Sequence, residues 1–118
     1  MKIINETKKI VLAENANLAD TPFKRIRGLL GRRSLEDREA LIIKPCNSIH
    51  TFFMNFPIDA LFVDSNNKVI KATTFLNPFR FTPIYFQSAY VIELPAGTIL
   101  SSNTSTGDFL LLCPSSPV

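Results

Sequence analysis

Short apolar segments, separated by proline, asparagine, glycine and serine, recur along this chain and restrict it to a fold built mainly from β-strands. The polar residues 64–68 (DSNNK) predict a hairpin turn between two of these segments. In 58–63 both faces of the expected strand are largely apolar, which is typical of a sheet that curls or is covered. The expected strands are 2–5, 10–13, 40–44, 49–53, 58–64, 69–76, 90–94 and 108–113, with 15–20 extended.

One helix is expected, over about residues 22–30. Thr21 can cap its first turn, and Pro22 suits the first helical position because a missing N–H costs nothing there. Gly31 can end the helix in the left-handed conformation. Four apolar side chains between them recur at helical spacing: Phe23, Ile26, Leu29 and Leu30. The expected fold class is therefore α+β, mainly antiparallel β, forming a small barrel-like or sandwich domain with one short helix.

The size of the chain predicts a single domain. With 118 residues, 46% of them apolar, it can bury one core without disulfides or metal. We expect one domain over 1–118, with a frayed tail at 114–118. The longest hydrophobic stretch, 49–63, is interrupted by polar residues, so no membrane span is expected. The first residues, MKIINETKK, lack the pattern of a secretory signal, which favours a cytoplasmic location.

The two cysteines, Cys46 and Cys113, lie far apart in the sequence, and neither belongs to a CxxC pair. They are expected to be buried free thiols rather than a redox motif. Together with His50 they fall short of the four closely spaced ligands of a typical structural zinc site. No metal and no cofactor are therefore expected.

Positive charge is concentrated in residues 24–33 (KRIRGLLGRR), which include five basic residues and no acid. Such a cluster would attract phosphate or carboxylate groups. We favour a simpler interpretation, a solvated helix face with one or two arginines paired to core acids. The net charge of the chain is only +3 and the remaining sequence adds no basic stripe, so nucleic acid is not an expected partner.

Two carboxylates, Asp59 and Glu93, stand among apolar neighbours in expected strands. A charge buried there is costly unless it meets a cation, several amides or a proton. Arg25 and Arg27 are the natural partners, because a guanidinium can bind a carboxylate through two parallel hydrogen bonds. Two interpretations remain open: a buried clasp between helix and sheet, or the floor of a ligand pocket.

The single histidine, His50, lies in an apolar segment that also holds Phe52 and Met54. In an enzyme, His50 would exchange protons near neutral pH, and Asp59 would orient it or act as the base. These two residues are therefore the candidate catalytic pair. Further along, residues 75–90 combine six aromatic side chains with two prolines and an arginine, and could form a stacking surface for a base, sugar or peptide, or simply close the core.

Short motifs along the chain occur in the order of a known family: ADT at 19–21, RIRGLLGR at 25–32, HTFFMNFPID at 50–59, FVD at 62–64, VIELPAG at 91–97 and GD at 107–108. In this order they resemble the uncharacterised bacterial and archaeal family catalogued as Domain of Unknown Function 192, over roughly 13–112. The resemblance implies a compact, single-domain, β-rich fold with one helix and no established activity. Its motif positions coincide with residues chosen above on physical grounds: Arg25, Arg27, Gly28, His50, Phe52, Met54, Asp59, Glu93 and Gly97.

The first functional hypothesis is a noncatalytic binding module for a small anionic, sugar-like or peptide ligand. Its ligand-binding residues would be Arg25, Arg27, His50, Phe52, Met54, Asp59 and Glu93. One alternative is a small hydrolase or nuclease-like enzyme that uses His50 and Asp59. The other is a protein–protein interaction module that uses the aromatic segment 75–90, provided that this segment is exposed.

Overall fold

The computed structural model describes residues 1–21, 35–52 and 54–114. The helix expected at 22–30 lies outside these residues. The strands are β1 (Lys2–Asn5), β2 (Ile10–Ala13), β3 (Asn15–Ala19), β4 (Glu39–Ile43), β5 (Ile58–Val63), β6 (Val69–Leu76), β7 (Tyr90–Pro95) and β8 (Leu110–Cys113), and the described helix is α2 (Thr98–Ser102).

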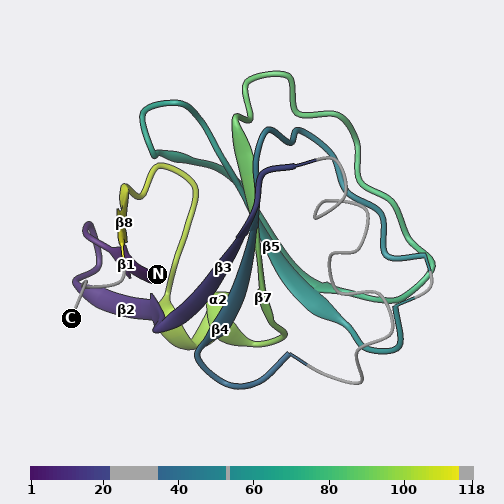
Figure 1. The fold of residues 1–118 in the computed structure, drawn as a ribbon, viewed down its shortest axis with the longest axis horizontal. Helices are drawn as coiled ribbons and strands as arrows, with labels where there is room; N and C mark the ends of the chain where they lie inside the picture. The colour runs from purple at the N-terminus through teal and green to yellow at the C-terminus, as the bar shows by residue number, and fades with distance from the viewer. Residues whose placement is uncertain (22–34, 53, 115–118) are drawn as a thin grey trace.

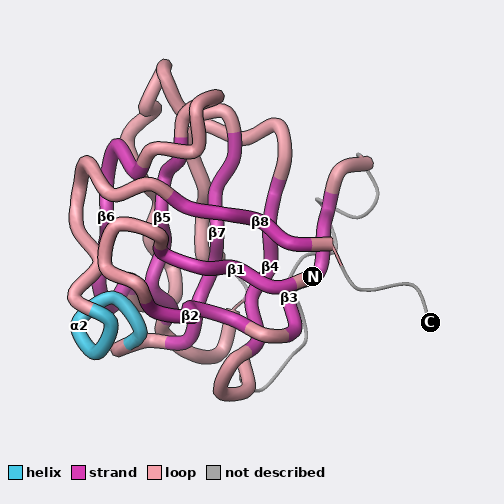
Figure 2. Tube along the Cα trace, turned by 90° about the vertical axis from the view of Figure 1, so that its left-hand side faces the viewer, coloured by secondary structure: helices cyan, strands magenta, loops and turns pink. Residues whose placement is uncertain are grey.

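The strands form two sheets that stack as a sandwich (Figure 1). The larger sheet has the order β3-β4-β7-β5-β6, and the smaller has the order β2-β1-β8. Neighbouring strands are antiparallel except β3 and β4, which run parallel. Figure 2 shows the strands of the smaller sheet lying across those of the larger one. The predicted mainly antiparallel fold is confirmed in its sandwich form, and over the described residues the sheets stay open rather than closing into a barrel.

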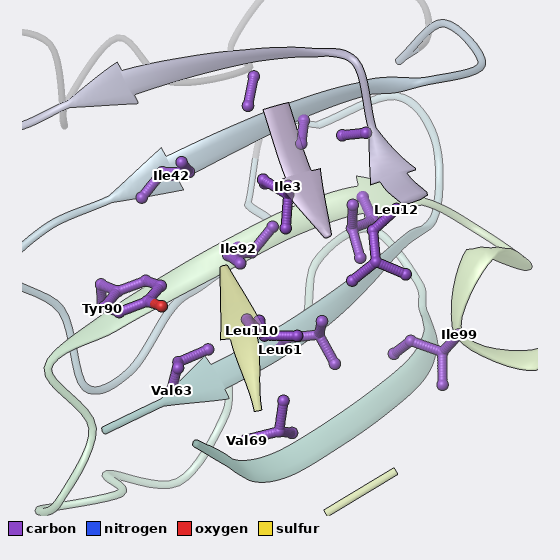
Figure 3. Close-up of a cluster of buried hydrophobic side chains, with 14 residues drawn as sticks. Ile3, Leu12, Ile42, Leu61, Val63, Val69, Tyr90, Ile92, Ile99 and Leu110 are labelled. Carbon is purple, nitrogen blue, oxygen red and sulfur yellow. The ribbon is translucent and has the colours of Figure 1, made fainter. Parts of the chain in front are cut away.

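The main core lies between the two sheets. Side chains of the smaller sheet, including Ile3, Leu12 and Leu110, meet Leu61 and Ile92 of the larger sheet (Figure 3). Each of these five side chains is at most 3% exposed. Burying one side chain of this size contributes about 1.5–3 kcal/mol, so this layer holds the sandwich together.

A second apolar cluster covers the opposite face of the larger sheet. Because side chains alternate along a strand, Ile58, Ala60 and Phe62 of β5 point away from the smaller sheet. Ile49 and Met54, from the connection between β4 and β5, pack against them. All six residues of β5 are buried as a result, which confirms the expected two-sided burial of this segment.

The hairpin turn predicted at 64–68 is present between β5 and β6. Asp64 N donates to Lys68 O at 2.9 Å, and Asp64 Oδ1 accepts bonds from the backbone N–H groups of Asn66 and Lys68, each at 2.9 Å. Asn67 adopts a positive φ of 65°, which asparagine tolerates better than most residues. The local sequence is therefore sufficient to specify this turn.

The strand expected at 49–53 is the clearest correction. His50 forms only an isolated bridge with Phe81, and no regular strand is assigned to its neighbours among the described residues. Helix α2 was not expected from the sequence. The extended segment at 15–20 is a true strand, β3, although its parallel pairing with β4 could not be foreseen from local pattern.

A buried polar cluster joins the first hairpin to the loop before β8. Asn5 Nδ2 donates to Thr104 Oγ1 at 3.0 Å and to Asp108 Oδ2 at 2.9 Å, and Lys8 Nζ pairs with Asp108 Oδ2 at 2.8 Å. Burial alone would raise the pKa of Asp108. Hydrogen bonds from Asn5, Lys8 and the Ser105 amide, with the charge of Lys8, hold that pKa below its usual value instead. The cluster therefore stabilises the ionised carboxylate where the two ends of the chain meet.

Candidate functional site

Asp59 is fully buried in β5, and its carboxylate is surrounded by backbone amides. Oδ1 accepts a hydrogen bond from Phe75 N at 3.0 Å. Oδ2 accepts from Gly97 N at 3.1 Å and from Ile99 N at 2.8 Å. Hydrogen bonds from several amides are one of the three ways in which a buried carboxylate charge was expected to be compensated. Asp59 is thus an internal anchor for backbone and is not presented to solvent.

The backbone that Asp59 binds needs this support. Phe75 has a φ of 50°, a left-handed conformation that costs a non-glycine residue about 1–3 kcal/mol. Gly97 precedes α2 with a φ of 99° and offers no side-chain cap to the helix. Because Ile99 N lies in the first turn of α2, Asp59 serves as a cap supplied by a neighbouring strand.

Glu93 lies on the opposite face of the larger sheet from Asp59. It pairs across the strands with Leu41 of β4 and Ala60 of β5, and residues paired in this way share a face. Leu41 and Ala60 belong to the second cluster, whereas Asp59 is paired with Leu94 of the main core. The structure therefore does not bring the two acids into one pocket.

Glu93 is only 4% exposed. This burial raises its pKa to about 7. Glu93 can therefore hold a proton at neutral pH and below. Protonation is another of the three expected ways to compensate a buried acid. The two acids that look alike in the sequence are accommodated by different physical means.

His50 is exposed and follows Ile49, which packs on the second cluster. The Asp59 carboxylate points to the other side of the sheet, where both its oxygens bind amides. The structure does not place the imidazole beside this carboxylate, which is the arrangement that the proposed catalytic pair needs.

The other predicted ligand-binding residues separate into three groups. Arg25 and Arg27 lie outside the described residues, so their contact with either acid stays a prediction. Met54 is 4% exposed and packs in the second cluster, where it acts as a core residue. Phe52 is the exception, because it reaches the surface beside His50.

An exposed group of rings gathers around Phe52. The centroid of its ring lies 5.5 Å from that of His50, 6.4 Å from that of Phe79 and 6.3 Å from that of Phe81. Phe52, Phe79 and Phe81 are 37%, 61% and 74% exposed. We call His50, Phe52, Phe79 and Phe81 the aromatic platform. In Figure 1 its two segments lie on the right, across the larger sheet from β1, β2 and β8.

Two buried threonines fasten the segments of the platform to each other. Thr51 N donates to Arg80 O at 2.8 Å, while Thr51 Oγ1 donates to Asn77 O at 2.6 Å and accepts from Arg80 N at 3.0 Å. Thr82 N donates to Ile49 O at 2.9 Å, and Thr82 Oγ1 accepts from Ile49 N at 3.0 Å. The threonines face inward, and the aromatic residues beside them in the sequence face solvent.

Replacing Thr51 with valine is expected to lower the free energy of unfolding by about 2 kcal/mol, because the Asn77 carbonyl and the Arg80 amide lose their side-chain partner. Urea denaturation measures this change. Thr74, an exposed residue of β6, provides the matched control, since its replacement with valine should alter stability by less than about 0.5 kcal/mol. Equal losses for the two variants would show that the Thr51 hydroxyl does not fasten the platform.

The backbone of the platform is strained at a residue that carries one of its rings. Phe79 has a φ of 61° and is held by a bond from its N–H to Thr51 O at 3.0 Å. Left-handed aromatic residues are uncommon, and such strain tends to occur at functional sites. Exposed phenylalanines are ordinary one at a time, whereas a contiguous exposed group of them is unusual on a monomeric protein.

Sequence reasoning found both parts of this surface without joining them. His50 and Phe52 were assigned to a ligand site, and the segment 75–90 was treated as a separate stacking surface. The signal that could have joined them is a threonine next to an aromatic residue in each segment, at HTF (50–52) and FT (81–82). When side chains alternate in a paired surface segment, a buried threonine has an exposed neighbour.

Within the described ranges, no group of three or more His, Cys, Asp or Glu side chains is placed to hold a metal ion. Cys46 and Cys113 are half-buried thiols and are not joined in a disulfide. In the same part of the chain, no helix has the length and apolar character needed to cross a membrane.

Taken together, the fold and its surface define a β-rich domain of two stacked sheets, with buried anchoring acids and an exposed aromatic platform. The chain belongs to the DUF192 family, described as "Uncharacterized ACR, COG1430", which residues 3–112 match. This match confirms the family that the sequence motifs indicated.

Relatives of the chain include UPF0127 proteins of archaea. The protein of Pyrococcus horikoshii is 37% identical over 112 residues, covering 90% of this chain and 94% of the relative. That of Thermococcus sibiricus is 36% identical over 110 residues, covering 90% of this chain and 71% of the relative.

Two crystal structures share the fold. A protein of unknown function from Novosphingobium aromaticivorans superposes with a TM-score of 0.83 at 21% identity, over 95% of this chain and 84% of that one. A putative transcription regulator from Sinorhizobium meliloti superposes with a TM-score of 0.79 at 23% identity, over 93% and 89% of the two chains. At these identities the likeness concerns the fold alone.

Proposed function

We propose that this protein is a noncatalytic binding module whose aromatic platform takes up an extended peptide segment bearing apolar side chains and a carboxylate. The observation that carries the proposal is the exposed group of four rings, fastened from below by two buried threonines. A surface that is apolar, exposed and rigid loses little conformational entropy on binding, which favours affinity.

The geometry of the rings favours apolar side chains over flat ligands. The ring of Phe52 is inclined by 31° to that of His50, by 52° to that of Phe79 and by 47° to that of Phe81. Rings inclined in this way form an uneven surface with spaces between them, unlike the parallel faces that stack on a base or a sugar. Peptide side chains can fill such spaces, and aromatic residues are the commonest anchors of such contacts.

The charge around the platform favours a ligand that carries a carboxylate. Residues 44–58 and 77–92, which contain the platform and its neighbours in the sequence, include no Asp or Glu. Arg80 is exposed and lies beside the platform, with its Nη1 donating to Phe79 O at 3.3 Å. A guanidinium forms paired, charge-assisted bonds with a carboxylate, so an acidic peptide complements this surface better than a basic one.

Titration with a short peptide tests the proposal. The probe is an acetylated tetrapeptide amide, Leu-Phe-Asp-Phe, and its counterpart with lysine in place of aspartate. In amide NMR spectra the acidic peptide is expected to shift the signals of Thr51, Phe79 and Phe81, and the basic peptide should bind more weakly. Replacing both Phe79 and Phe81 with alanine should weaken binding by about tenfold or more, since each aromatic anchor contributes on the order of 1 kcal/mol.

Phe109 provides the matched control, because it is 47% exposed and adjoins β8 of the smaller sheet, away from the platform. Its replacement with alanine should leave the affinity for the acidic peptide unchanged. The proposal fails if millimolar acidic peptide leaves the platform signals in place, or if the Phe79 and Phe81 double variant binds as well as the wild type.

A further inference from the structure

We infer that Asp59 is a positioning residue for the aromatic platform, which it fixes through the backbone amide of Phe75. The inference rests on the proposed function where binding is concerned, but the link from Asp59 to the ring geometry stands independently of any ligand. The effect of Asp59 on the four rings would pass along the chain that leaves β6.

The first step is a bulge at the end of β6. Ile58 pairs with Leu76 and Ala60 pairs with Thr73, so two residues of β6 lie opposite the single residue Asp59. These two residues are Thr74 and Phe75. A bulge of this kind turns the strand and leaves an amide outside the regular ladder of hydrogen bonds. Asp59 Oδ1 stands at this place and accepts the bond from Phe75 N at 3.0 Å.

The second step is the short path from the bulge to the platform. Only Leu76 separates Phe75 from Asn77, whose carbonyl accepts the 2.6 Å bond from Thr51 Oγ1. Phe79 follows two residues later with its own bond to Thr51 O. The Asp59 bond at one end and the Thr51 bonds at the other therefore set the direction in which the chain leaves the sheet and presents its rings.

The third step is the rigidity of Asp59 itself. Its Oδ2 is bound to the Gly97 and Ile99 amides at the start of α2, and α2 packs beside β2 and β6. The carboxylate is consequently held from two sides and cannot follow a displaced Phe75. When Oδ1 no longer accepts the Phe75 amide, the bulge loses the bond that fixes it, and a change of register there reverses the faces of the following side chains.

Asp59→Asn tests the inference, because the side chain keeps its size while one acceptor oxygen becomes a donor. Thr104→Val provides a destabilised control, since it removes the side-chain bonds to Asn5 and Ser102 but leaves the bond between Asp59 and the Phe75 amide in place. Both variants are studied at a temperature at which each retains a folded, dispersed NMR spectrum. The readouts are the nuclear Overhauser contacts between the rings of Phe52, Phe79 and Phe81, and the affinity for the Leu-Phe-Asp-Phe peptide.

Asp59→Asn is expected to lose ring contacts and to bind the peptide at least fivefold more weakly, whereas Thr104→Val should keep both despite its lower melting temperature. Retained ring contacts in Asp59→Asn overturn the inference. If the wild-type protein does not bind the peptide, the proposed function is wrong. The role of Asp59 is still decided in that case, because the ring contacts are measured without the peptide.

A second variant serves if Asp59→Asn does not fold. Adding Phe75→Gly relieves the left-handed strain, because glycine adopts a positive φ readily, but it does not restore the bond to Asp59. The double variant should fold and still lack the ring contacts between Phe52, Phe79 and Phe81. Phe75→Gly alone should keep them, and intact contacts in the double variant would refute the positioning role.

Discussion

Replacing Asp59 with alanine is expected to lower the free energy of unfolding by about 4 kcal/mol. Three backbone amides, the buried one of Ile99 and the partly buried ones of Phe75 and Gly97, would lose their acceptor at once. Each unsatisfied buried group costs about 1–3 kcal/mol, and water entering the space left by the carboxylate recovers part of that cost. Urea denaturation at neutral pH measures the difference.

Asp64 offers the comparison for this prediction. Its carboxylate also accepts backbone bonds, from Asn66 and Lys68, but these lie in the exposed hairpin turn where water can replace them. Asp64→Ala should therefore cost about 1 kcal/mol or less. A loss below about 1 kcal/mol for Asp59→Ala would mean that Asp59 is not the anchor that its contacts indicate.

Replacing Glu93 with glutamine is expected to stabilise the protein above neutral pH by up to about 3 kcal/mol. Burial raises the pKa of Glu93 from 4.5 to about 7, so the folded state holds its proton more tightly than the unfolded state does. The stability linked to this proton is complete below pH 4.5 and is lost as the pH rises through about 7. The free energy that separates these two pKa values is about 3 kcal/mol.

Chemical denaturation between pH 4 and pH 9 tests this prediction. Wild-type protein should lose stability between pH 5 and pH 8, and Glu93→Gln should lose less over that interval. Glu6 is exposed, so Glu6→Gln should leave the wild-type profile unchanged. Parallel profiles for the wild type and Glu93→Gln would show that Glu93 is not held neutral by burial.

The strands could be predicted from the sequence because their signals are local. The bounds predicted for β1, β2 and β6 agree with the structure residue for residue. Turn residues mark the ends of these segments, and apolar side chains mark the faces that become buried. The burial of Asp59 and Glu93 was predictable for the same reason, since each lies within an apolar strand.

The arrangement of the site could not be predicted, because it depends on pairing between distant segments. Ala60 pairs with Glu93, and this register sends Asp59 to the opposite face, although both acids lie in strands of similar composition. Helix α2 has only five residues and receives its cap from Asp59, far away in the sequence. The segment at 49–53 has the aromatic composition of a strand, but the side-chain bonds of Thr51 replace part of a regular ladder there.

The pairing of β1 with β8 has a consequence for synthesis of the chain. Residues 2–5 are synthesised well before their partner strand at 110–113. Until then Ile3 and its apolar neighbours have no completed sheet to cover them, and the loop that must close contains every strand of the larger sheet. The smaller sheet, which shields the larger one, therefore forms only after the larger sheet has been synthesised, and nascent chains remain vulnerable to aggregation until β8 is released.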